Sequence, residues 1–119
     1  MRIMIAAKNK ALGSALRTLI EFNGHNDEIL VSEEPTSFFE RLSKLDFGVI
    51  LLDWDLFNSR TINVIRVIKN DYPQLRLICM DIHHENIRNA LDASADAFFF
   101  KSDPPVELLN LIRRFRLMQ

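Results

Sequence analysis

The fold is decided by the stretch Phe47-Gly48-Val49-Ile50-Leu51-Leu52-Asp53-Trp54-Asp55. Its apolar part has no polar alternation, which is typical of a strand buried on both faces of a parallel sheet that helices cover. The run ends directly at Asp53, so a carboxylate is expected at the edge of that sheet. Sheets of this kind bind their ligands outside the carboxyl ends of the strands, which makes Asp53 the first candidate for a functional residue.

Four further apolar runs and five helical patterns alternate with this strand. The runs cover residues 3–6, 28–31, 75–80 and 97–100. Apolar residues recur every three or four positions, as on one face of a helix, over residues 12–20, 38–45, 62–68, 87–91 and 106–115. The last helix is expected to begin at Pro104 with Asp103 as its cap. This alternation predicts a doubly wound (βα)5 three-layer sandwich with a five-stranded parallel sheet.

The composition is that of one globular domain, which we expect to span residues 1–119. Apolar residues make up 48% and charged residues 26% of the chain, and the net charge is -1. This balance gives no general attraction to nucleic acid or to an anionic membrane. Cys79 is the only cysteine, which excludes an internal disulfide and fits a reducing compartment. No apolar run approaches the length of a membrane span or a signal peptide, so a cytoplasmic protein is expected.

The predicted strand ends bring four short segments to one edge of the sheet, at residues 6–9, 53–58, 79–83 and 101–103. Asp53 and Lys101 both follow buried strands at this edge, so we expect them to form a charge pair. A simpler interpretation is that Asp53 only caps a helix or a turn, as aspartates after strands often do.

Three segments resemble response-regulator receiver domains of the CheY type. Residues 49–55 are similar to the phosphoacceptor strand of that family, and residues 85–101 to its fourth helix, its Gly-Ala-Asp-Gly-aromatic turn and its fifth strand. Residues 104–109 resemble its last helix. The resemblance covers nearly the whole chain and implies the strand order 2-1-3-4-5.

The resemblance also implies a role for each matching residue. Asp53 is at the position that accepts a phosphoryl group from a histidine kinase, and Lys101 and Cys79 are at the positions that bind the phosphoryl oxygens. Asp55 is at the position that gives a backbone carbonyl to a divalent metal. Phe98 is at the position of the switch aromatic.

The departures from the family pattern concern the metal. The family's acidic pair falls at Ala7 and Lys8, and residues 1–20 contain no acid at all. Magnesium is held by carboxylates, waters and phosphate oxygens, so we expect weak or absent magnesium binding, with Asp53 and Asp55 as the residual candidates and no other cofactor. Lys8 is expected to form a salt bridge with Asp53, either filling the metal site or merely holding a vestigial pocket together. Phe57 also stands where the family usually has Pro.

The resulting hypothesis is an atypical receiver in two-component or phosphorelay signalling. It is expected to be weakly phosphorylated or not phosphorylated, to have no enzymatic activity, and to act through protein contacts. A homodimer through the predicted elements at residues 87–91, 97–100 and 104–115 is one such contact. Its partner would be a histidine kinase or another signalling protein; any DNA-binding output domain would lie beyond residue 119.

Two alternatives remain open at this point. In the first, Lys8 replaces the metal and Asp53 is phosphorylated normally, as in the receiver of a transcriptional regulator. In the second, the chain is a flavodoxin-like domain that binds a small molecule. The chain has only three glycines and no glycine-rich phosphate loop, which counts against the second.

Overall fold

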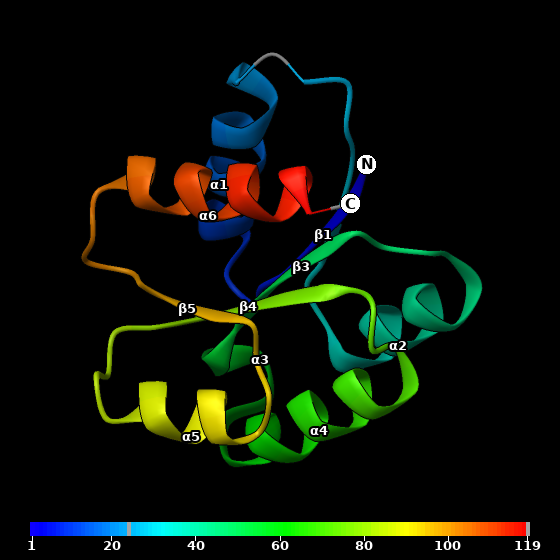
Figure 1. Cartoon of the computed structure of the whole chain (residues 1–119), viewed down its shortest axis with the longest axis vertical. Helices are drawn as coiled ribbons and strands as arrows, with labels where there is room; N and C mark the ends of the chain where they lie inside the picture. The colour runs from blue at the N-terminus through cyan, green and yellow to red at the C-terminus, as the bar shows by residue number, and fades with distance from the viewer. Residues whose placement is uncertain (24, 119) are drawn as a thin grey trace.

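The computed structural model describes residues 1–23 and 25–118. Five parallel strands form one sheet in the order β2-β1-β3-β4-β5, as the resemblance implied (Figure 1). The strands are β1 (Arg2–Ala6), β2 (Glu28–Ser32), β3 (Val49–Asp53), β4 (Arg76–Asp81) and β5 (Ala97–Phe100). The predicted alternation of strands and helices is therefore confirmed, and β3 lies at the centre of the sheet.

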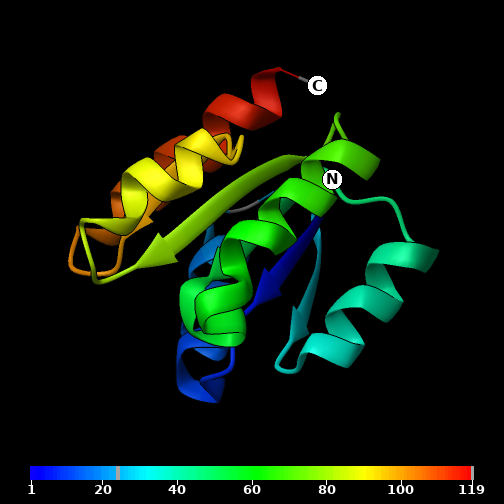
Figure 2. The same ribbon diagram turned by 90° about the horizontal axis from the view of Figure 1, so that it is seen from below.

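Helices cover both faces of the sheet, so the molecule has three layers (Figures 1 and 2). The helical segments are α1 (Lys10–Phe22), α2 (Pro35–Lys44), α3 (Trp54–Phe57), η1 (Asn58–Arg60), α4 (Thr61–Asp71), α5 (Asn86–Asp92) and α6 (Pro105–Leu117). Helices α1 and α6 cover one face, and α2 to α5 cover the other. No helix in the described parts of the chain is long and apolar enough to cross a membrane.

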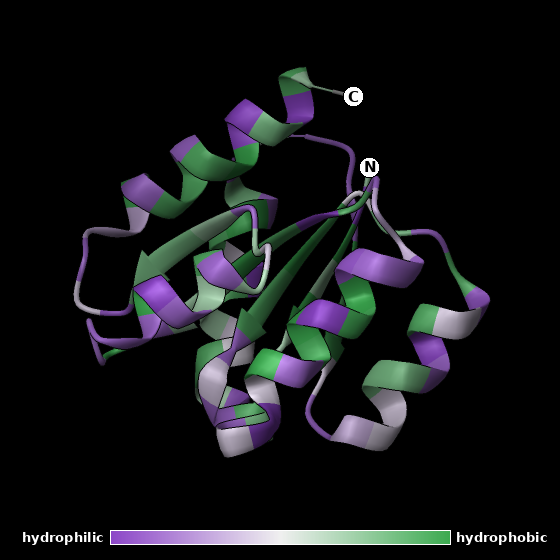
Figure 3. Ribbon diagram, turned by 60° about the horizontal axis from the view of Figure 1, so that its bottom comes forward, coloured by the Kyte–Doolittle hydropathy of each residue, from purple (hydrophilic) through white to green (hydrophobic). Residues whose placement is uncertain are grey.

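The central strand explains why the sheet is stable. All five residues of β3 are buried, and its four apolar residues alternate between two apolar cores. Val49 and Leu51 belong to the core under α1 and α6, whereas Ile50 and Leu52 belong to the core under α2 to α5. Figure 3 shows the hydrophobic strands between helices whose surfaces alternate in hydropathy. Burial on both faces fixes the register and so fixes the position of Asp53 at the strand end.

Two local features differ from the sequence prediction. The last helix begins at Pro105 with Pro104 as its N-cap, and no side chain caps it. Asp103 instead belongs to the preceding turn, where its backbone N–H donates to the Phe100 carbonyl at 2.9 Å. The short helix α3 was not predicted, because four residues are too few to show a helical period.

Ser94 follows α5 with a φ of 82°, a left-handed conformation that costs L-residues about 1–2 kcal/mol. The resemblance places the family's glycine at this position. We therefore expect Ser94→Gly to raise the free energy of unfolding by about 1 kcal/mol in urea denaturation. The matched control is Ser43→Gly within α2, which should lower stability by a similar amount. Destabilisation by Ser94→Gly would contradict this account of the turn.

Candidate functional site

The carboxyl edge of the sheet brings together charged residues from three loops. The Lys101 Nζ lies 2.7 Å from Asp53 Oδ1 and 3.3 Å from Asp55 Oδ2. Asp53 is almost fully buried, with 1% of its side chain exposed, whereas Asp55 has 64% exposed. The predicted Asp53–Lys101 pair is confirmed, and Lys101 joins both carboxylates.

Asp53 also has a structural role. It is the N-cap of α3, and its Oδ1 accepts a hydrogen bond from the Asp55 backbone N–H at 3.2 Å. Capping satisfies one of the backbone donors that a helix start leaves free. The Asp53 side chain therefore caps α3 and also belongs to the charged site.

The burial of this pair affects both pKa values. Burial raises the pKa of the Asp53 carboxyl above its ordinary value, against the lowering effect of the hydrogen bonds from Lys101 and Asp55. Burial acts to lower the pKa of Lys101, but the hydrogen bonds and charges of Asp53 and Asp55 together outweigh it and raise that pKa. Lys101 is therefore protonated at neutral pH, and its positive charge compensates the buried Asp53 carboxylate.

The raised pKa of Asp53 gives a stability prediction for Asp53→Asn. Since the folded pKa lies above the unfolded one, the ionised carboxylate lowers stability at neutral pH, and this cost disappears as the pH falls below both values. Asparagine keeps the capping oxygen, and Asp55 still pairs with Lys101. We expect the free energy of unfolding at pH 7 to be unchanged or higher by up to about 1 kcal/mol, and the difference to shrink on acidification. Urea denaturation at several pH values checks this; a loss above about 1 kcal/mol at pH 7 would contradict it.

Lys8 lies at the same site but makes no ion pair with any residue that the structure describes. It is exposed, and together with Asn9, Asp53, Asp55, Asn58 and Lys101 it lines an open cleft of about 700 Å³. The expected salt bridge between Lys8 and Asp53 is absent among the described residues, because Lys101 already holds the carboxylate from within the pocket. Lys8 thus brings to the cleft an ammonium group that pairs with no carboxylate in the described part of the chain.

The other predicted positions lie in the core next to the cleft. Ala7 is fully buried, and its backbone N–H donates to the Ser32 carbonyl at 3.0 Å. Cys79 is also fully buried and does not line the cleft; burial, helped by the charge of Asp96, raises the pKa of its thiol to about 12. Phe98 is half-buried beside Phe100, with ring centroids 5.1 Å apart. The phosphoryl-binding role of Cys79 and the switch role of Phe98 stay predictions.

The oxygen donors at the cleft are few. Asp53 and Asp55 supply the two carboxylates, and both are paired with Lys101. Within residues 1–23 and 25–118, no three His, Cys, Asp or Glu side chains are grouped so that they could hold a metal ion.

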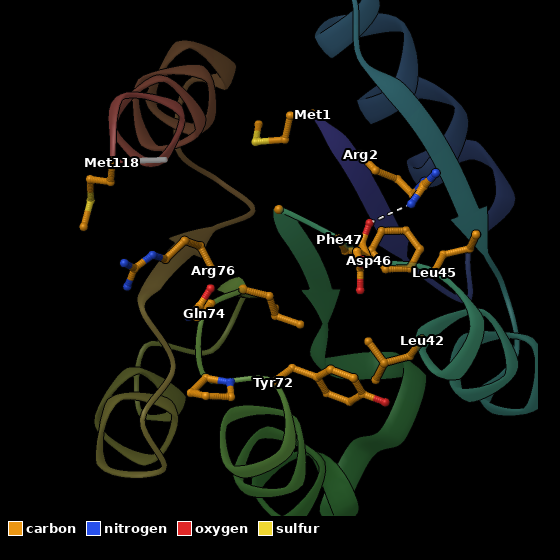
Figure 4. A pocket seen from close by; sticks show the side chains of 13 residues that line it. Met1, Arg2, Leu42, Leu45, Asp46, Phe47, Tyr72, Gln74, Arg76 and Met118 are labelled. Carbon is orange, nitrogen blue, oxygen red and sulfur yellow. Dashed lines mark hydrogen bonds between the residues drawn. The ribbon is translucent and has the colours of Figure 1, made fainter.

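A larger hollow, of about 960 Å³, lies at the opposite edge of the sheet (Figure 4). Arg2 and Arg76 flank it from opposite sides, but both are already bound: Arg2 to Glu28 at 2.8 Å, and Arg76 to Asp96 at 3.3 Å. It is formed where the strands begin, away from the edge at which doubly wound sheets place their ligands. We therefore assign the candidate site to the smaller cleft at Asp53.

Comparison with known proteins identifies the family. The model of the response regulator receiver domain matches residues 3–113. The chain belongs to the response regulator receiver domain family. This receiver is 22% identical over 114 residues to the nitrate/nitrite response regulator protein NarP of Escherichia coli (strain K12), covering 94% of the chain and 53% of NarP. It is 33% identical over 69 residues to the transcriptional activator protein ExaE of Pseudomonas putida, covering 56% of the chain and 32% of ExaE.

Solved structures of low identity show the same fold. The signal receiver domain of a DNA-binding response regulator protein (merR) from Colwellia psychrerythraea 34H superposes with a TM-score of 0.89 at 18% identity, covering 100% of this chain and 99% of that one. This receiver spans about half the length of NarP and about a third of ExaE.

Sequence reasoning placed Asn58 at this edge of the sheet but missed its backbone conformation, and it did not assign Leu12 to the receiver's cleft. Asn58 lines the cleft with a φ of 50°, a conformation that few non-glycine residues adopt. Asparagine is among the residues that tolerate positive φ best, and Asn58-Ser59 begins the short helix η1, which lies between α3 and α4. That dipeptide was the available signal for a turn at this point.

Proposed function

We propose that this receiver is an atypical member of its family, which acts as a protein-interaction module and needs no divalent metal. Receiver domains work with histidine kinases in two-component systems, and this chain keeps the phosphoacceptor position as Asp53. In our proposal Asp53 is phosphorylated weakly or not at all, and the domain is not an enzyme. The observation that carries the proposal is the sharing of Lys101 by both carboxylates of the cleft, with Lys8 beside them.

The charge balance of the cleft supports this proposal. Two carboxylates, Asp53 and Asp55, face two ammonium groups, Lys101 and Lys8. A divalent cation would have to displace Lys101 from Asp53 and would then be repelled by Lys8. Magnesium also demands near-octahedral oxygen coordination, usually with one or two free carboxylates. The residues present therefore do not fit a magnesium ion, and we derive no phosphoryl-transfer step through one.

The surface formed by α5, β5 and α6 is our candidate for partner contacts. It exposes Leu91 on α5 and Val106 on α6, with 47% and 54% of each residue accessible, and Ile82 in the loop before α5 is 60% accessible. His84 stacks on Phe100 at a centroid distance of 3.9 Å in the same region. Exposed apolar side chains are typical of protein contacts where they form a patch, and we propose that these residues form one. We propose that this face makes a homodimer or binds a signalling partner, without nucleic-acid contacts by these residues.

One specific observation favours an alternative, in which Lys8 takes over from the metal. The Lys8 ammonium is unpaired among the described residues and reaches the same cleft as Asp53. A cation near the attacked phosphoryl group neutralises developing charge, which is a large part of phosphoryl-transfer catalysis. Membership of the receiver family sets aside the other alternative, a flavodoxin-like small-molecule domain.

A phosphorylation assay separates these possibilities. The wild type, Lys8→Ala and Asp53→Asn are incubated with acetyl phosphate, with and without magnesium, and analysed by intact mass. Our proposal predicts little acid-labile phosphate on the wild type and no response to magnesium. Efficient labelling that Lys8→Ala abolishes would favour the Lys8 alternative. Efficient, magnesium-dependent labelling that only Asp53→Asn abolishes would contradict both.

A further inference from the structure

Another hollow lies between α2 and α4, on the face of the sheet that α2 to α5 cover. It has a volume of about 570 Å³, and α2 and α4 run side by side along it (Figure 2). Six of its eight lining residues are apolar. Two of these, Leu56 and Phe57, belong to α3, are buried, and form the floor of the hollow. The lining residues are Pro35, Phe39, Leu56, Phe57, Arg60, Asn63, Val64 and Val67. We call this feature the α2–α4 groove.

The walls of the α2–α4 groove expose large apolar side chains. Phe39 on α2 is 40% accessible and Val67 on α4 is 50% accessible. Helices of a monomer usually turn such residues toward the core, so exposed apolar residues on both sides of one groove indicate a contact surface.

An aromatic cluster makes the groove a preformed feature. The ring of Phe57 lies 5.4 Å from that of Phe38 and 5.6 Å from that of Phe39, and the two α2 rings are 5.1 Å apart, edge to face. Phe38 is fully buried, which anchors the other two rings to the core. A fixed aromatic wall lowers the conformational entropy that the groove itself loses when a partner binds. Phe57 is also the position at which this chain departs from the proline of its family.

The single charge in the groove selects the chemistry of the partner. Arg60 is exposed, directly precedes α4, and makes no ion pair or side-chain hydrogen bond with any residue that the structure describes. A guanidinium at the mouth of an otherwise apolar groove favours a ligand that combines apolar side chains with a carboxylate.

We propose that the α2–α4 groove docks an amphipathic helix of a partner protein, with apolar side chains spaced three or four residues apart and a carboxylate that pairs with Arg60. A helix fits better than a strand because the groove is bounded by helices and offers no free strand edge. The groove is linked to the site at the sheet edge through α3, because Leu56 and Phe57 in the floor of the groove belong to this helix and Asp53 caps it. A partner in the groove would thus contact the turn that begins at Asp53.

The probe is a fluorescein-labelled, 16-residue amphipathic helical peptide with leucines on one face and glutamates on the other. A second peptide carries lysines in place of the glutamates. Anisotropy titration and 1H–15N NMR shift mapping are performed on the wild type, Val67→Ser, Arg60→Ala and Phe22→Ser. Phe22 on α1 is the control because it is an exposed apolar residue, 90% accessible against 50% for Val67, on the other face of the sheet and outside the surface of α5, β5 and α6.

We expect the glutamate peptide to shift the signals of the groove residues and to bind more tightly than the lysine peptide. Val67→Ser should weaken its binding by roughly fivefold or more, and Phe22→Ser should not. Arg60→Ala should remove the preference for glutamate. The proposal is overturned by absence of shifts at up to 1 mM peptide, by shifts on another face, or by equal loss in the Val67→Ser and Phe22→Ser variants. Self-association of the chain that Val67→Ser abolishes would also overturn it, in favour of a second copy as the occupant.

Discussion

Replacement of Asp27 by alanine is expected to lower the free energy of unfolding at pH 7 by about 2–4 kcal/mol. Arg116 at the end of α6 donates two hydrogen bonds to the Asp27 carboxylate, at 2.8 and 2.7 Å. The Asp27 side chain is only 2% exposed, and the Met1 amino group lies 3.4 Å from it. The substitution leaves two cations without their shared partner, which is more costly than the loss of an exposed ion pair. Urea denaturation measures the change.

The pH dependence of stability gives an independent test of Asp27. The hydrogen bonds from Arg116, opposed by burial, lower the pKa of Asp27 below its ordinary value of 3.8. The carboxylate therefore contributes stability that is fully present above this value and is lost as the pH falls through the folded pKa. The deficit of Asp27→Ala should shrink over the same acidic range. Glu28→Ala is the control: its partner is Arg2, its side chain is 56% exposed, and it should cost less than about 1 kcal/mol. If Asp27→Ala and Glu28→Ala lowered the free energy of unfolding equally, burial would not be the reason for the stronger contribution of Asp27.

The double variant Ala7→Asp/Lys8→Asp is expected to gain divalent-metal binding. It places two carboxylates at the positions where the family keeps its acidic pair, next to Asp53, and removes the ammonium group of Lys8. Affinity for manganese, measured by isothermal titration calorimetry, should rise on the order of 100-fold over the wild type, which corresponds to about 2.8 kcal/mol.

The single variant Lys8→Ala is the control for this gain, because it removes the repelling charge without adding a ligand. It should raise metal affinity much less than the double variant does. Adding Asp53→Asn to the double variant should reduce the gained affinity. If the double variant bound metal no better than the wild type, the loss of the acidic pair would not be the reason for a metal-independent receiver.

The sheet was predictable because its signals are local and repeated. The unbroken apolar run before Asp53 marks a strand buried on both faces, and β3 has all five residues buried. The Tyr72-Pro73 dipeptide marks the end of the third long helix, and α4 does end at Asp71. The start of α6 was wrong by one residue, because Pro104 and Pro105 both fit a helix start and only the fold decides between them.

The site was predictable only where strand ends dictate it. Asp53 ends β3 and Lys101 follows β5 at the same edge of the sheet, and their pairing at 2.7 Å was expected. Lys8 was assigned to the same pair because sequence places it at this edge, but sequence does not say which of two lysines reaches a buried carboxylate. The short helix α3 and the positive φ of Asn58 escaped notice for a related reason: both depend on how the loop packs.

We propose that Asp53 is held by Lys101 and that this receiver needs no metal. A titration of the wild-type chain with magnesium, and then with magnesium plus beryllofluoride, tests this when it is followed by 1H–15N NMR of the residues around Asp53. We expect no saturable shifts at millimolar magnesium and no beryllofluoride complex. Tight, saturable binding of magnesium with formation of a beryllofluoride adduct at Asp53 would contradict it.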